Sequence, residues 1–193
     1  MTFSITARCP DTGQFGVAIS SSSIAVGARC PWLLPGVGAV SSQNITLPSL
    51  GPEVLALMEQ GQAPDTALDQ VLTRNGYSQY RQITAINHLG QTAHFSGAQT
   101  LGVHNAVSGE QCVAAGNMLA GRSVIEAMVS AFEEGEGQLA DRLIKALHAA
   151  QGQPVGLAIE LGQGMEGAED IGRAIDKQQV HEQRFHWTGS GAV

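Results

Sequence analysis

The spacing of apolar residues changes from a period of two to a helical period and back, and this order of segments limits the fold most. Phe3, Ile5 and Ala7 alternate with polar residues, and the alternation resumes at Phe15 after a turn-forming segment around Gly13. A period of two places successive side chains on opposite faces of a strand. The sequence therefore predicts a β-hairpin that begins at the N-terminus. A less regular pair of strands is predicted over residues 24–28 and 36–43.

Two short helices interrupt the strands. Apolar residues occur at helical spacing between residues 50 and 60, with Ser49 as a candidate N-cap. Pro64 opens a second segment of this kind, which ends before Asn75 and Gly76. Proline is favoured in the first turn of a helix, where its missing N–H costs nothing. We expect these helices to pack as a pair on a sheet.

The strand pattern returns in the second half of the chain, and a second pair of helices follows it. Ser123 and Glu126 match the Ser-x-x-Glu capping box, which predicts that Ser123 caps the first helix of this pair. A further strand and a polar helix are predicted after the pair. The predicted strands span 82–88, 91–96, 101–107, 111–116 and 154–161, and the predicted helices span 123–132, 139–150 and 168–177.

The order of strands, two helices, strands, two helices and a strand predicts an α+β fold with mainly antiparallel pairing. Two sheets packed face to face, with the helix pairs outside, would bury this many apolar strands. We expect a single domain over residues 1–161. Residues 162–193 are predicted to form a C-terminal extension that packs on the domain or trails from it.

Composition excludes several classes of protein. Hydrophobic residues make up 43% of the chain and charged residues 14%, which is typical of a folded domain rather than a disordered chain. The net charge of −7 disfavours nucleic acid or an anionic membrane surface as a partner. The three cysteines are widely spaced, as expected for reduced thiols in the cytoplasm. We expect a cytoplasmic protein that acts on a small molecule, with neither nucleic acid nor membrane as its partner.

The sequence offers little support for a cofactor or a metal ion. Glycines at positions 162, 164 and 167 form a literal GxGxxG motif, but the 26 polar residues that follow leave little room for a second parallel strand. A nucleotide-binding βαβ unit is the alternative, and a flexible glycine loop is the simpler interpretation. His181 and His186 are five residues apart, which does not suit two metal ligands on one helix face.

Thr2 is the first candidate for chemistry. Removal of Met1 would leave Thr2 with a free α-amine next to its own hydroxyl group. An α-amine has an ordinary pKa near 7.7–8.0, so it can act as a general base at neutral pH without a histidine. Thr2 is therefore a candidate nucleophile.

Several short motifs occur together in the order of a known family. They resemble the bacterial family catalogued as domain of unknown function 1028, and the resemblance covers about residues 1–135. It implies the fold of the N-terminal-nucleophile (Ntn) hydrolases, a four-layer α-β-β-α sandwich of two mainly antiparallel sheets. The motifs are TFSI at 2–5, GVA at 16–18, AVG at 25–27, PW at 31–32, GVGAV at 36–40 and GNMLAG at 116–121.

The resemblance also implies roles for individual residues. Thr2 matches the family's N-terminal threonine, and Asn117 is expected to offer a side-chain N–H group to an oxyanion. Relatives often carry a lysine near the end of the second strand, but the lysines of this chain are Lys145 and Lys177. One usual way to lower the pKa at the nucleophile is therefore missing. The residues expected to line the same cleft and bind substrate are Gln43, Asn44, Ser21 and Ser22.

The expected activity is hydrolysis of a small, non-peptide amide C–N bond by Thr2, without a metal ion or an organic cofactor. The alternative is an Ntn-like protein that no longer catalyses and serves in binding or assembly. By analogy with relatives of this architecture, we expect a homodimer or a higher homo-oligomer.

Overall fold

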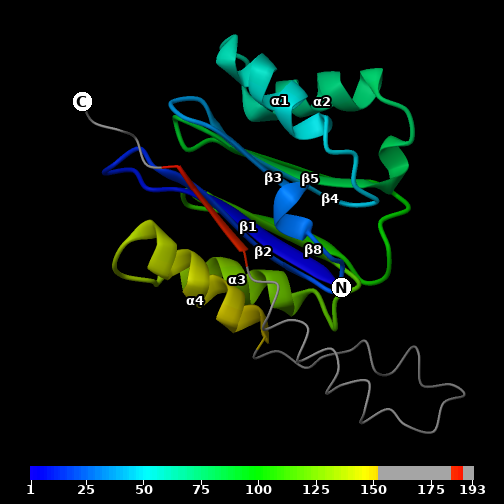
Figure 1. Cartoon of the computed structure of the whole chain (residues 1–193). Helices are drawn as coiled ribbons and strands as arrows, with labels where there is room; N and C mark the ends of the chain where they lie inside the picture. Colours follow the sequence, from blue (N-terminus) through cyan, green and yellow to red (C-terminus); the bar gives the residue numbers. More distant parts are fainter. Residues whose placement is uncertain (152–183, 189–193) are drawn as a thin grey trace, which may run out of the picture.

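The computed structural model describes residues 1–151 and 184–188, and in this part of the chain the strands form two antiparallel sheets (Figure 1). The five-stranded sheet has the order β7-β8-β1-β2-β9, with bounds Asn105–Gly109, Cys112–Asn117, Thr2–Arg8, Phe15–Ser21 and Arg184–Thr188. The four-stranded sheet has the order β3-β4-β5-β6, with bounds Pro31–Leu34, Gly38–Asn44, Arg81–Asn87 and Thr92–Ser96.

Four helices cover the outer faces of the two sheets (Figure 1). Helices α1 (Leu50–Glu59) and α2 (Pro64–Arg74) cover the four-stranded sheet. Helices α3 (Ser123–Glu133) and α4 (Leu139–Gln151) cover the five-stranded sheet. The layers therefore run helix pair, sheet, sheet, helix pair, and the prediction of a mixed α+β fold with two mainly antiparallel sheets is confirmed.

The alternation in β1 decides which residues enter the helix-covered core. Phe3, Ile5 and Ala7 are fully buried and pack with residues of α3 such as Met128 and Phe132. Burying a large side chain of this kind stabilises the fold by about 1.5–3 kcal/mol. A second core lies between the four-stranded sheet and helices α1 and α2.

The other face of β1 is polar although it is also buried. Ser4 and Thr6 point toward the four-stranded sheet, where the Thr6 and Thr84 hydroxyl oxygens lie 3.0 Å apart. The two sheets thus meet through hydrogen bonds along the first part of β1. Near the end of β1 they meet instead through a small apolar cluster that includes Phe15 and Ile86.

The structure corrects two details of the predicted helices and one predicted strand. Ser123 is the first helical residue of α3 and Arg122 is the N-cap, and neither side chain caps the helix, so the capping-box prediction is wrong. Ser49 occupies the N-cap position of α1 but makes no capping hydrogen bond. Pro64 begins α2 as predicted. Residues 24–28 contain the 3₁₀ helix η1 (Val26–Ala28) instead of a strand.

Sequence reasoning missed two strands. The strand β3 is only four residues long, and its apolar residues do not alternate with polar ones. The strand β9 lies in the predicted C-terminal extension, for which no strand was expected. It pairs antiparallel with β2, with Thr188 opposite Phe15 and Arg184 opposite Ile19. A second 3₁₀ helix, η2 (Ser78–Tyr80), precedes β5. The GxGxxG motif and the elements predicted over 154–161 and 168–177 lie outside the described residues.

None of the helices in residues 1–151 is long and apolar enough to cross a membrane.

Candidate functional site

Thr2 is the first residue of β1, the central strand of the five-stranded sheet. In the register of this sheet, Thr2 pairs with Ser21 on β2 and with Asn117 on β8. Residues paired across antiparallel strands place their side chains on the same face. Thr2, Ser21 and Asn117 therefore meet on the face that looks toward the four-stranded sheet. The fold brings together three of the residues that the resemblance implied for one cleft.

The hydroxyl of Thr2 has a defined partner. Its Oγ1 lies 2.8 Å from Ser21 Oγ, and either hydroxyl can be the donor. Ser21 Oγ also accepts a hydrogen bond of 3.1 Å from the backbone N–H of Ser23. Ser21 is buried while Thr2 is half-buried, so the Thr2 hydroxyl lies at the surface of the polar layer between the sheets.

Met1 precedes Thr2 and is held by Ser22 on the segment that follows β2. Its α-amine donates to Ser22 Oγ at 3.0 Å and lies 3.8 Å from Met118 Sδ. Burial lowers the pKa of the Met1 α-amine below its ordinary value. The Met1 carbonyl accepts from the backbone N–H of Ser22 at 3.0 Å and from Ser22 Oγ at 3.4 Å. Ser22 thus directs two donors at an amide carbonyl that adjoins Thr2.

A network of buried amide side chains lies between the two sheets next to this site, and Gln82 on β5 is its centre. Gln82 Oε1 accepts from Gln43 Nε2 at 2.9 Å and from Asn117 Nδ2 at 3.0 Å. Gln82 Nε2 donates to the Gly116 carbonyl and to Ser96 Oγ, both at 3.0 Å. Gln82 therefore joins both sheets and fixes the orientation of Asn117 next to Thr2.

Sequence reasoning missed Gln82. Gln82 and Thr84 alternate with Ile83 and Ala85, a pattern that is typical of a strand with one face in water. The second sheet covers this polar face instead, and no local pattern in the sequence reports that cover.

The remaining predicted site residues have partners within the protein. Gln43 is buried, accepts from Ser4 Oγ at 2.8 Å, and also donates to the Ala115 carbonyl at 3.1 Å. Asn44 has a left-handed backbone with φ of 72° at the end of β4. Its amide donates to the Tyr80 carbonyl at 2.6 Å and accepts from the Leu101 N–H at 3.3 Å, so it holds neighbouring loops together. The Asn117 NH₂ group uses one hydrogen for Gln82 and retains a second.

Residues 1–151 contain no metal-ligand cluster, and their two buried cysteines are poor nucleophiles. No group of three or more potential metal ligands occurs in these residues. Burial raises the pKa of the Cys30 thiol, and it raises that of Cys112 to about 12. Both thiols are therefore protonated at neutral pH, and a thiol is a much weaker nucleophile than a thiolate.

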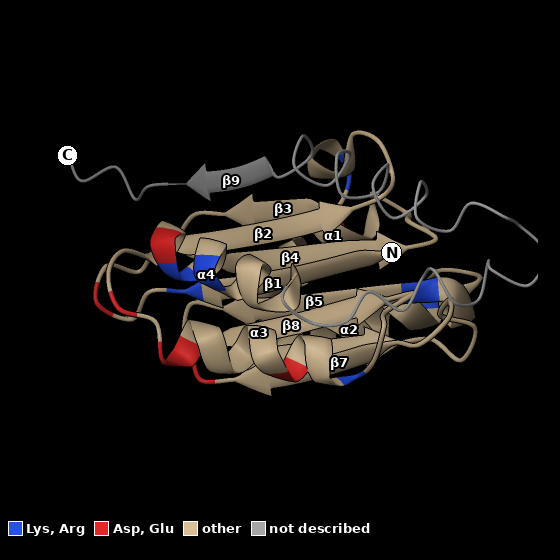
Figure 2. Ribbon diagram, turned by 90° about the horizontal axis from the view of Figure 1, so that it is seen from below, with Lys and Arg blue, Asp and Glu red and all other residues tan. Residues whose placement is uncertain are grey.

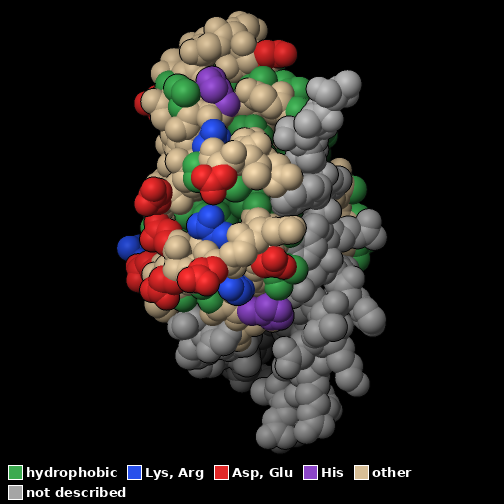
Figure 3. All heavy atoms as spheres, turned by 90° about the vertical axis from the view of Figure 1, so that its left-hand side faces the viewer, with side chains coloured by type: hydrophobic (Ala, Val, Ile, Leu, Met, Phe, Trp, Pro, Cys, Tyr) green, Lys and Arg blue, Asp and Glu red, His purple; other side chains and the backbone are tan. Residues whose placement is uncertain are grey.

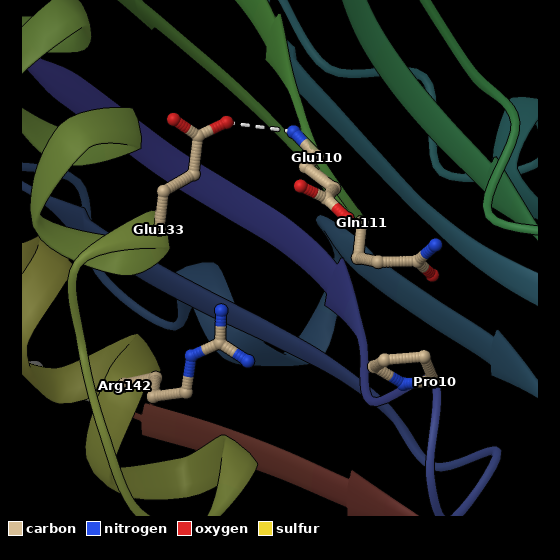
Figure 4. Close-up of a pocket in the computed structure, with 5 residues that line it drawn as sticks. All are labelled: Pro10, Glu110, Gln111, Glu133 and Arg142. Atoms are coloured by element: carbon tan, nitrogen blue, oxygen red, sulfur yellow. Dashed lines mark hydrogen bonds between the residues drawn. The ribbon is translucent and has the colours of Figure 1, made fainter.

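A shallow cavity of about 260 Å³ lies at the opposite end of the five-stranded sheet (Figure 4). The Arg142 guanidinium is held by two hydrogen bonds to the Phe132 carbonyl and stacks 4.1 Å above the Phe132 ring. Glu133 Oε1 accepts from the Glu110 N–H at 2.7 Å. Arg142 and Glu133 are thus held by hydrogen bonds within the protein, and these bonds connect α3 with α4 and with the β7–β8 turn. The cavity is lined by Pro10, Glu110, Gln111, Glu133 and Arg142.

Comparison with known proteins assigns the family. Residues 2–154 match the model of a family of unknown function, DUF1028, and the chain belongs to this family. The match confirms the resemblance inferred from the short motifs and extends beyond residue 135. A similar solved structure is the crystal structure of protein SPO2555 from Silicibacter pomeroyi, whose description names the DUF1028 family. It is 34% identical over 78% of this chain and 67% of that chain, with a TM-score of 0.76. No curated protein matches this chain.

Proposed function

We propose that this protein is an Ntn hydrolase that cleaves a small, non-peptide amide with Thr2 as its nucleophile, once Met1 has been removed. The observation that carries the proposal is the Thr2 hydroxyl, half-buried at the start of the central strand and 2.8 Å from Ser21 Oγ. The order helix pair, sheet, sheet, helix pair supports it, because the Ntn sandwich has the same layers with its nucleophile at the start of the first strand.

The reaction would proceed in two steps. Thr2 Oγ1 attacks the amide carbonyl carbon, and its proton passes to the Thr2 α-amine. The resulting ammonium group then gives this proton to the leaving nitrogen as the C–N bond breaks, which leaves an ester on Thr2. Water attacks the ester in the second step, with the α-amine again as base, and releases the carboxylic acid.

Ser22 and Asn117 are the candidates for stabilising the oxyanion. The Ser22 N–H and hydroxyl that bind the Met1 carbonyl would become available after Met1 is removed. The second N–H of Asn117 Nδ2 adds a donor on the other side of Thr2. Removing one such donor typically costs 10²–10³ in rate.

The first experiment is mass spectrometry of the intact protein together with a screen of amide substrates. The proposal requires that active protein is lighter than the encoded chain by one methionine residue. Turnover by protein that retains Met1 would overturn the Thr2 mechanism. Uniform retention of Met1 without turnover would favour the alternative, an Ntn-like protein that acts in binding or assembly.

The rate should depend on pH through the α-amine of Thr2. The base must be neutral, so kcat/KM is expected to rise with pH through the pKa of this amine and then to level off. Burial lowers the pKa of the Met1 amine, and we expect the partial burial of Thr2 to act in the same direction on the amine that removal of Met1 creates. The midpoint should therefore lie below about 7.7, the lower end of the ordinary range. A midpoint above this range, measured with Thr2 and with Thr2→Ser, would contradict the assignment of the base.

A further inference from the structure

Within residues 1–151, the loops at the Thr2 end lack acidic residues. Five segments of this part of the chain leave or enter the sheets at this end, at residues 22–30, 44–49, 75–80, 97–104 and 118–122, and none contains Asp or Glu. Residues 1–151 have 11 acidic residues, and all of them lie outside these five segments.

The opposite end of the molecule has the reverse character. Asp11 lies in the β1–β2 turn, Glu110 in the β7–β8 turn, and Glu134 and Glu136 between α3 and α4. Figure 2 shows acidic residues on the loops at the end away from the N-terminus, and Figure 3 shows this end with its cluster of red side chains. From the loops of residues 1–151, an acidic ligand would therefore meet less repulsion at the Thr2 end than at the opposite end.

The Thr2 end also exposes apolar side chains. Residues 1–151 contain six large hydrophobic side chains that are classed as exposed, and five of them stand in the segments just described. Ile24 and Tyr77 are 74% and 71% exposed. Leu89 is the sixth and lies in the β5–β6 turn at the other end. We name the five side chains the apolar rim, which consists of Ile24, Ile45, Tyr77, Leu101 and Val103.

Hydrogen bonds connect the segments of the rim to the strand that carries Asn117. The Met118 N–H donates to the Leu101 carbonyl at 2.9 Å, and the Leu119 N–H donates to the Val103 carbonyl at 2.8 Å. Through Asn44, the Leu101 segment is also bound to the end of β4, directly before Ile45. The part of the rim that carries Ile45, Leu101 and Val103 is therefore fixed relative to the strand that carries Asn117.

Two arginines complete the surroundings. Arg29 lies beside the rim, since its guanidinium donates to the Ile24 carbonyl. Arg122 is exposed in the segment that follows Asn117. Without carboxylates in the same segments, these cations favour a negatively charged ligand. Apolar side chains that stay exposed together typically mark a binding surface.

We propose that the substrate of the Thr2 site is an N-acylated amino acid, in which an apolar acyl chain contacts the rim and the carboxylate faces Arg29 and Arg122. This inference rests on the proposed function for the site of cleavage. The amide bond between the two parts of such a molecule is the bond that Thr2 would attack. Its hydrolysis releases a fatty or aromatic acid and a free amino acid.

The test measures binding and turnover separately. Full-length Thr2→Ala protein that lacks Met1 is titrated by calorimetry with N-hexanoyl-leucine, its carboxamide, and N-acetylglycine. We expect N-hexanoyl-leucine to bind at least about tenfold more tightly than either of the others. Equal affinities for the three compounds would overturn the inference. Release of leucine by the unaltered protein is then measured: ordered affinities without release would refute only the proposed function, and release without ordered affinities would refute only the substrate class.

Variants of the rim provide the matched control. Ile24→Asp and Leu101→Asp are expected to weaken binding of N-hexanoyl-leucine about tenfold or more, because each places a carboxylate in the apolar rim that contacts the acyl chain. Leu89→Asp introduces the same change at the opposite end, on a residue whose exposed fraction lies between those of Leu101 and Ile24, and should leave the affinity unchanged. Circular dichroism checks that each variant is folded. If the rim variants alter the mass in light scattering and leave the affinity unchanged, the rim is a protein interface and the inference fails.

Discussion

Thr2→Ala is expected to lower kcat for amide hydrolysis by about 10⁴-fold or more, with little change in the free energy of unfolding. The substitution removes the attacking oxygen and leaves the strand and its backbone pairing in place. Loss of a nucleophile that forms a covalent intermediate has effects of this order in other hydrolases. The measurement is single-turnover kinetics with protein whose Met1 is shown to be absent.

Two variants make this result interpretable. Thr2→Ser keeps a hydroxyl group at the same atom and should retain substantial activity. Thr73→Ala removes an exposed hydroxyl on α2, which bonds only to the Asp69 carbonyl, and should have no effect on kcat. A Thr2→Ala protein that hydrolyses amides at the original rate would show that Thr2 is not the nucleophile.

Gln82→Leu is expected to lower the free energy of unfolding by about 3 kcal/mol and to remove most of the activity. Leucine has a similar volume but makes no hydrogen bond, so it leaves Asn117 Nδ2, the Gly116 carbonyl and Ser96 Oγ without their Gln82 partner. Each buried polar group that loses its partner costs about 1–3 kcal/mol. Chemical denaturation gives the stability, and the pH profile of kcat/KM reports on the site.

The control for this variant is Gln60→Leu, which changes an exposed glutamine at the end of α1. It should shift neither stability nor activity by more than a small amount, about 0.5 kcal/mol. Gln82→Glu keeps an acceptor for Asn117. When the two variants are compared under conditions in which both are fully folded, Gln82→Glu should retain more activity than Gln82→Leu. If Gln82→Leu is as stable as the unaltered protein, the amide network does not hold the two sheets together at the Thr2 site.

The sequence predicted the helix-covered half of the molecule well, because the pattern there is local. Phe3, Ile5 and Ala7 alternate, and they enter the core as that alternation requires. Pro64 begins a helix because its ring holds φ near the helical value. Ser123 is the exception, since the capping box requires serine at the N-cap and this position is occupied by Arg122.

The polar half of the site was beyond local patterns. Ser4 and Thr6 alternate with apolar residues as they would in a strand exposed to water, but a second sheet covers them. The pairing of Thr2 with Asn117 spans 115 positions of the chain and depends on the register of β1 and β8. Residues such as Gln82 gain their importance from contacts between sheets, which the order of residues within one strand does not report. The chemistry of a threonine next to the initiator Met pointed to Thr2, the family resemblance added Asn117, and periodicity indicated neither.

The two sheets are joined by different interactions at their two ends, and this difference affects how easily they separate locally. Near Phe15 and Ile86, separating the sheets would expose hydrocarbon to water. Near Ser4 and Gln43, separation would expose hydroxyl and amide groups that water can solvate in place of their partners. Transient parting should therefore be easier at the polar end, and native-state hydrogen exchange should be faster for amides at the start of β1 than at its end. Equal protection along β1 would mean that the sheets move only as one body.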